Sequence, residues 1–161
     1  MQAKPLTYSL RQDFQKLTFE AQVLKHFQKF KQLLPEDLEA GGQLFATFKA
    51  NEVSVKVATG PYKEDRRKKF SFWPIRKKSQ QDISQLFDNG LHYIGDWHTH
   101  PQEIPIASSQ DNFSMRDKYI KSQHELKTFV MVIVGQNSFP EGLWVSIHDK
   151  DFMKKLEVSR I

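Results

Sequence analysis

The sequence contains no cysteine among its 161 residues. This absence excludes a disulfide-stapled scaffold, a thiolate nucleophile, and a zinc or iron–sulfur centre built on cysteine ligands. Any metal ion that this chain binds must therefore be held by His, Asp or Glu side chains.

Long hydrophobic runs are also missing. No segment approaches the ~20 consecutive apolar residues that a membrane-spanning helix needs, and the polar segment Met1–Leu10 lacks the apolar stretch of a signal peptide. We therefore expect a cytoplasmic protein that does not act at a membrane. No Gly/Ser-rich linker, repeat or low-complexity tract divides the chain, so we expect residues 1–161 to form one domain.

What the chain does have is enough apolar material for a core and one concentrated patch of charge. Apolar residues make up 39% of the sequence, with 13 Phe and 3 Trp, which excludes a disordered chain. The net charge is +5, but Lys63 to Lys78 alone holds eight cations and two anions, a local charge of +6. The rest of the chain sums to −1, so the positive character is local.

This basic stretch, residues 60–78, resembles an insertion, and three interpretations of it stay open. It can be a solvated loop. It can be a nucleic-acid patch, because Phe70, Phe72 and Trp73 interleave with the cations. It can also be a docking surface for an acidic partner protein.

The hydrophobic pattern predicts strands and helices that interleave along the chain. Alternation predicts strands near 6–10, 17–19, 44–48, 53–57, 70–73, 91–98, 128–134 and 143–147. Helical spacing predicts helices over 20–34, around 83–87, over 111–124 and, at the end, over 151–158. Because short turns join some neighbouring strands, we predict an α/β protein of the α+β type, with a mixed β-sheet flanked by helices.

The segment from Trp97 to Pro101 carries the clearest indication of chemistry. His98 and His100 lie two apart on a predicted strand, so both imidazoles point to the same side. Such a pair suits zinc, and a carboxylate from the following helix can add a third ligand; Asp111 is the candidate. The pattern Ser108-x-x-Asp111 is also typical of a helix N-terminal cap, and Ser108 can cap the helix and face a site together.

These residues together resemble the signature of the JAMM (JAB1/MPN/Mov34) metalloprotease family. The signature has His98-x-His100-Pro101, then Ser108-x-x-Asp111, and it needs a Glu upstream at the start of a Gly-bearing strand. The segment Glu39-Ala40-Gly41-Gly42 fits that requirement. The wider phrase from Tyr93 to Pro101 resembles a bacterial branch, the JAB-domain isopeptidases encoded in CBASS anti-phage operons beside a cGAS-like nucleotidyltransferase. Asp96 stands where that branch more often has Glu.

The resemblance implies a single JAB/MPN domain and a mechanism. His98, His100 and Asp111 would hold Zn²⁺, Glu39 would be the general base, and the Ser108 hydroxyl would stabilise the oxyanion. The implied activity is that of a zinc-dependent isopeptidase or peptidase, which cuts the bond after the C-terminus of a ubiquitin-like or conjugated protein. The implied substrate is the cGAS-like synthase joined to its targets.

Other functions remain as alternatives. A JAB hydrolase could act on another small ubiquitin-like or sulfur-carrier protein. A small-molecule hydrolase or deaminase is less favoured, because zinc deaminases usually use Cys ligands. A basic nucleic-acid-binding module with a relic site is the third alternative, although the intact set of five residues makes nucleic acid an unexpected partner. Asp96 and Glu103 could each support an imidazole N–H, but plain strand and loop roles are favoured for them. The other four histidines are not assigned to the site.

Overall fold

The structure, a computed structural model, describes residues 4–10 and 15–159. Residues 1–3, 11–14 and 160–161 lie outside the described residues. The expectation that Met1–Leu10 contains no signal peptide falls partly on residues 1–3 and so lies partly outside them. In the part of the chain that is described, no helix has the length and apolarity to cross a membrane.

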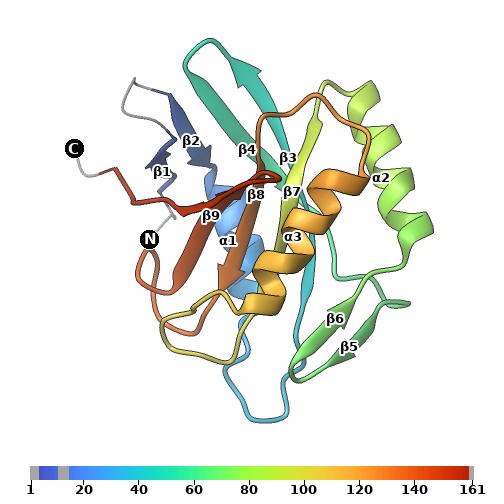
Figure 1. Cartoon of the computed structure of the whole chain (residues 1–161). Helices are drawn as coiled ribbons and strands as arrows, with labels where there is room; N and C mark the ends of the chain where they lie inside the picture. The colour runs from blue at the N-terminus through green and yellow to red at the C-terminus, as the bar shows by residue number, and fades with distance from the viewer. Residues whose placement is uncertain (1–3, 11–14, 160–161) are drawn as a thin grey trace.

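A mixed sheet forms the centre of the molecule (Figure 1). Its strands are β1 (Leu6–Ser9), β2 (Lys16–Phe19), β3 (Gly41–Lys49), β4 (Glu52–Ala58), β7 (His92–Thr99), β8 (Phe129–Val134), β9 (Leu143–His148) and β10 (Met153–Lys155), in the order β1-β2-β4-β3-β7-β8-β9-β10. The pairs β2/β4 and β7/β8 are parallel and the others antiparallel. Two further strands, β5 (Arg66–Lys68) and β6 (Ser71–Trp73), form a separate hairpin.

Helices cover both faces of this sheet, which confirms the predicted α+β architecture. Helix α1 (Ala21–Lys29) lies behind the sheet in Figure 1, α3 (Ser109–Lys121) lies in front of it, and α2 (Arg76–Asp88) runs beside β7. The larger core, which includes Phe27 and Trp97, lies between α1 and the sheet. A smaller core around Met115 and Phe129 lies under α3.

A bulge in β7 decides which side chains face which helix. Leu44 of β3 pairs with Gly95, but the next residue pairs with Tyr93, so that Ile94 is the extra residue. Gly95 is required here because a Cβ atom would lie 1.8 Å from the carbonyl oxygen of Val130. Past the bulge, Trp97 packs against Phe27 of α1. Asp96 and His98 point to the other side, where they meet Lys118 and Asp111 of α3.

Two of the predicted helices differ from the structure. The predicted terminal helix over 151–158 is wrong, because this segment forms β10 and pairs with the open edge of β9. The predicted helix over 20–34 ends at Lys29. Its continuation is replaced by a turn in which the backbone N–H groups of Leu33 and Leu34 donate to Asp37 Oδ2 at 3.1 and 2.9 Å.

The histidine of β9 lies in the interior and gives a pH prediction. His148 is 1% exposed, and burial lowers its pKa from the usual 6.5 to about 4. Trp144 Nε1 donates to Ser146 Oγ at 2.8 Å, and Ser146 Oγ lies 2.7 Å from His148 Nε2, so the hydroxyl can donate to a neutral imidazole. The buried site therefore favours the uncharged ring.

Stability should consequently fall in mild acid. Between pH ~6.5 and ~4 the unfolded chain binds the proton and the folded chain does not, so the free energy of unfolding should drop by about 3 kcal/mol as the pH falls through this window. Urea unfolding at pH 7 and pH 5 should show about 2 kcal/mol of this loss in the wild type, because pH 5 is still above the folded-state pKa, and a smaller loss in His148→Gln. Equal losses in both proteins would contradict the assignment to His148.

Candidate active site

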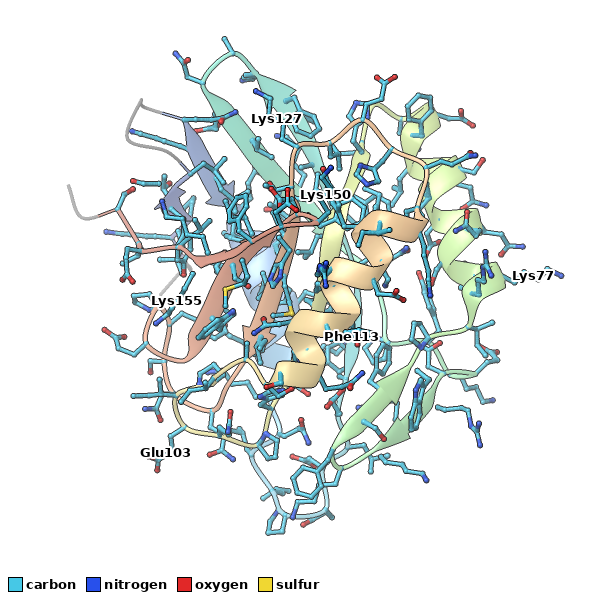
Figure 2. The ribbon with its side chains drawn as sticks, in the orientation of Figure 1. Lys77, Glu103, Phe113, Lys127, Lys150 and Lys155 are labelled. Atoms are coloured by element: carbon cyan, nitrogen blue, oxygen red, sulfur yellow. The ribbon has the colours of Figure 1, made fainter. Side chains whose placement is uncertain are left out.

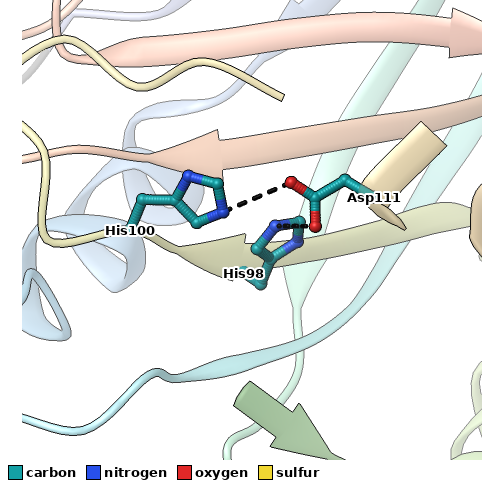
Figure 3. A group of neighbouring side chains, drawn as sticks. All are labelled: His98, His100 and Asp111. Carbon is teal, nitrogen blue, oxygen red and sulfur yellow. Dashed lines mark ion pairs between the residues drawn. The ribbon is translucent and has the colours of Figure 1, made fainter. Parts of the chain in front are cut away.

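Two histidines and one aspartate converge on the α3 side of the sheet (Figure 3). His98 comes from the end of β7, His100 from just after it, and Asp111 from the first turn of α3. His98 Nε2 lies 3.2 Å from Asp111 Oδ1, and His100 Nε2 lies 3.3 Å from Asp111 Oδ2. The structure thus brings together the three residues that the sequence predicted as metal ligands.

The arrangement fits a bound cation better than a set of hydrogen bonds. His98 Nε2 is buried and has no hydrogen-bond partner, despite its closeness to the carboxylate. Ligand atoms around a tetrahedral ion with bonds of ~2.0 Å are separated by about 3.3 Å. The distance from each imidazole Nε2 to its nearer Asp111 oxygen is close to this value. A positive ion among these atoms would satisfy the otherwise orphaned nitrogen, so the three residues can hold a divalent cation.

His100 is oriented by a residue that the sequence analysis missed. Gln102 Oε1 accepts from the backbone N–H of Ile106 at 3.1 Å and lies 3.0 Å from His100 Nδ1. Since this oxygen can only accept, Nδ1 must donate to it, which leaves Nε2 of the neutral ring free to bind a cation. Burial lowers the pKa of His100, but Asp111 and Gln102 together outweigh that effect and raise it.

Asp111 is held in place by a reciprocal cap at the start of α3. Ser108 Oγ accepts from the Asp111 N–H at 3.0 Å, and Asp111 Oδ2 accepts from the Ser108 N–H at 2.9 Å, which confirms the predicted capping pattern. Burial alone would raise the pKa of Asp111, but the two imidazoles and the cap hold it far below its usual value. The cap uses Ser108 only as an acceptor, so its hydroxyl proton is available to another group.

Glu39 lies on the same face as the histidines. Gly41 pairs with His98, and the Thr99 N–H donates to the Ala40 carbonyl at 2.9 Å, so the antiparallel register places residue 39 opposite His100. Only 9% of Glu39 is exposed. Burial raises the pKa of its carboxyl group, the nearby imidazoles oppose this, and Asp111 reinforces it.

The other polar candidates do not join this group. Asp96 accepts from Tyr93 Oη at 2.9 Å and pairs with Lys118 on α3, so it supports no imidazole of the site. Glu103 is exposed and projects outward from the loop before α3 (Figure 2). Among the remaining histidines, His26 Nε2 lies 2.6 Å from the carbonyl oxygen of Gly60, on the α1 side.

The basic segment is ordered in the structure. Its middle forms the hairpin β5–β6, and its last residues begin α2, where Lys77 points into solvent (Figure 2). Tyr62 donates to Asp82 of α2, which anchors the segment at its start. This stretch therefore has regular structure in place of an irregular loop, although most of its cations are exposed to solvent. The structure tests neither nucleic-acid binding nor docking to an acidic partner.

The fold and this site define a domain of the JAB type. The chain belongs to the family of prokaryotic homologs of the JAB domain (Prok-JAB), whose model matches residues 25–146. This confirms the family resemblance that the sequence motifs carried.

Named relatives agree with this assignment, and a solved structure shares the fold. The chain is 25% identical over 140 residues to a CD-NTase/cGAS isopeptidase of Escherichia coli (strain TW11681), which covers 85% of each chain. It is 27% identical over 125 residues to a CD-NTase/cGAS isopeptidase of Pseudomonas aeruginosa (strain BWHPSA011 / Pa011), covering 76% of this chain and 78% of the relative. Its fold is similar to that of protein DSY2949 from Desulfitobacterium hafniense, with a TM-score of 0.62 and 16% identity over 86% of this chain and 88% of the other.

Proposed function

We propose that this protein is a zinc-dependent isopeptidase of the JAMM type. It hydrolyses the bond after the C-terminus of a ubiquitin-like or otherwise conjugated protein. The observation that carries the proposal is the convergence of His98, His100 and Asp111 within bonding reach of one cation, with the buried carboxyl group of Glu39 on the same face. The similarity to named isopeptidases supports hydrolase activity.

Each of the five residues then has a chemical role. Zinc held by the two imidazoles and Asp111 would lower the pKa of a bound water and polarise the scissile carbonyl. Glu39 takes the proton of the attacking water and delivers it to the leaving amine, and its raised pKa brings it closer to neutral pH, where a general base works best. Ser108 donates its unused hydroxyl proton to the developing oxyanion.

The proposed substrate is a cGAS-like nucleotidyltransferase joined through its C-terminus to a target amine. The names of the two relatives support this substrate class. The resemblance of Tyr93–Pro101 to the CBASS branch adds a proposed role in anti-phage defence. We further propose that residues 1–161 act as one JAB domain in the cytoplasm, with residues 60–78 as its basic insertion.

The substrate assignment is tested with a purified conjugate of such a nucleotidyltransferase. Wild-type protein loaded with zinc should release the free C-terminus, and the chelator-treated protein should not. A parallel reaction with a ubiquitin-like or sulfur-carrier conjugate measures preference. Faster release from that second conjugate would move the assignment to the other substrate class, and no release from either would remove the isopeptidase proposal.

Ser108 gives a prediction that separates its two roles. Replacing an N-cap Ser by Ala typically costs about 1 kcal/mol of stability, whereas Gly costs only a few tenths. Both replacements remove the hydroxyl donor, and loss of one oxyanion donor costs about 10²–10³ in kcat. Ser108→Ala and Ser108→Gly should therefore lose activity equally, while thermal unfolding shows a clear loss only for Ala. Full activity in Ser108→Gly would exclude the oxyanion role.

A further inference from the structure

Glu39 lies in a segment that has no regular secondary structure. From residue 30 to residue 40 the chain runs between α1 and β3 through turns and irregular backbone. A carboxylate on such a segment keeps its direction only if the backbone around it is held by contacts from elsewhere in the fold. The direction of the Glu39 carboxylate therefore depends on the groups that contact this backbone.

The basic hairpin β5–β6 holds this backbone from both sides. The Glu39 N–H donates to the carbonyl oxygen of Lys68 at 2.7 Å. In return, Arg67 Nε donates to the carbonyl oxygen of Glu39 at 2.9 Å, and Arg67 Nη2 donates to that of Leu38 at 3.3 Å. The guanidinium fork thus binds two successive carbonyls, which a single ammonium group could not match in geometry.

A buried amide ties the same hairpin to the metal-binding strand. Gln32 is fully buried, and its Nε2 donates to the carbonyl oxygens of Lys69 at 2.9 Å and Asp37 at 3.2 Å. Its Oε1 accepts from Thr99 Oγ1 at 2.7 Å, and that hydroxyl accepts from the Ala40 N–H at 2.9 Å. The hairpin, the Glu39 segment and the residue between the two histidines therefore share one hydrogen-bond network.

Close packing completes the attachment. The ring of Phe72 on β6 lies directly against Gly41, because a Cβ atom at position 41 would come within 2.7 Å of Phe72 Cδ1. Gly41 lies two residues after Glu39 and opposite His98. Because Gly41 has no side chain, Phe72 of the hairpin can pack directly against the backbone of β3 beside His98.

We propose that Arg67 is a positioning residue for the general base, and that the hairpin β5–β6 serves to aim the carboxylate of Glu39 at the metal ligands. This inference rests on the proposed function of Glu39. Arg67 is one of the eight cations of the basic segment, and the role proposed for it depends on its hydrogen bonds and not on its charge alone. Arg67 is half-buried against the Glu39 segment, whereas Arg66 and Lys68 beside it on β5 are exposed.

The adjacent Arg66 supplies a matched control. Arg66→Ala and Arg67→Ala remove the same charge from the same strand, but only the second removes the bonds to residues 38 and 39. We expect Arg67→Ala to lower kcat about 100-fold, the loss that a misplacement of about 1 Å can cause, with KM changed no more than in Arg66→Ala. Arg67→Lys should recover part of the loss, since it can reach one carbonyl.

A second measurement does not depend on activity. Hydrogen exchange of the Glu39 and Ala40 amides should be faster in Arg67→Ala than in the wild type and in Arg66→Ala, with bound zinc unchanged. If Arg67→Ala does not fold, Arg67→Lys carries the test, with intermediate kcat and faster exchange expected. Equal kcat and equal exchange in the Arg66 and Arg67 variants would overturn the proposal. A rise of KM to the same extent in both variants, with kcat unchanged, would also overturn it, because that result indicates that the two arginines bind substrate.

The failure of this inference can be told apart from failure of the proposed function. If Glu39→Gln is inactive and Arg67→Ala behaves like Arg66→Ala, Glu39 remains the base and the hairpin has another role. If Glu39→Gln cleaves as fast as the wild type, the proposed function itself is wrong.

Discussion

Glu39→Gln should lower the cleavage rate by about 10²- to 10⁴-fold, the typical contribution of a general base. The amide has the shape of the carboxyl group but cannot take a proton from water. Because Glu39 is not one of the three proposed ligands, the variant should bind the same amount of zinc as the wild type. Turnover of the conjugate and metal content measured on the same samples check both expectations.

The same segment contains a suitable control for this variant. Glu36 is exposed and lies three residues before Glu39, so Glu36→Gln removes one carboxylate from the same segment and should keep wild-type turnover. Loss of zinc in Glu39→Gln would show that this carboxyl group acts mainly as a ligand. Equal turnover in the two variants would exclude Glu39 as the base.

His98→Ala should abolish activity by removing a metal ligand. Loss of a residue that merely supports a ligand costs about 10- to 100-fold in metal affinity, so loss of a direct ligand should cost more. Excess zinc should restore the chelator-treated wild type and fail to restore the variant. Because a ligand that binds only the folded state stabilises it, zinc should raise the Tm of the wild type and leave that of His98→Ala unchanged.

His92 provides the control on the same strand. It is half-buried at the start of β7, packs against Phe48 and Phe87, and contributes nothing to the site. His92→Ala should keep both the zinc response and the turnover. Full activity of His98→Ala after exhaustive chelation would refute the metal-dependent mechanism.

The parts of the site that could be predicted are those set by local geometry. The spacing of His98 and His100 places both rings on one side of any strand, and Ser108-x-x-Asp111 builds its cap within a single helical turn. Both features depend only on residues close together in the sequence. The position of Glu39 could be predicted from the family resemblance, although no local pattern marks it.

The supporting residues could not be predicted, because their partners lie far away in the chain. Gln32 has the polar spacing of a solvent-facing helix residue, yet it is fully buried and bonds to Thr99, 67 positions later. In the sequence, nothing distinguishes Arg67 from the other cations of the basic segment. Only the structure shows that it donates to the carbonyl oxygen of Glu39. The terminal helix was wrong for a related reason, since the free edge of β9 outweighed the local helical spacing.

By itself the sequence determined the kind of chemistry available: with no cysteine, a metal could be held only by oxygen and imidazole ligands, and the motifs named which ones. The tertiary structure alone decided that these ligands face α3, because the bulge at Ile94 reverses the alternation of β7. It alone decided as well that Glu39 is buried opposite His100 and held by a hairpin from the basic segment. Such placements arise from register and long-range hydrogen bonds, and these form only when distant segments pack together.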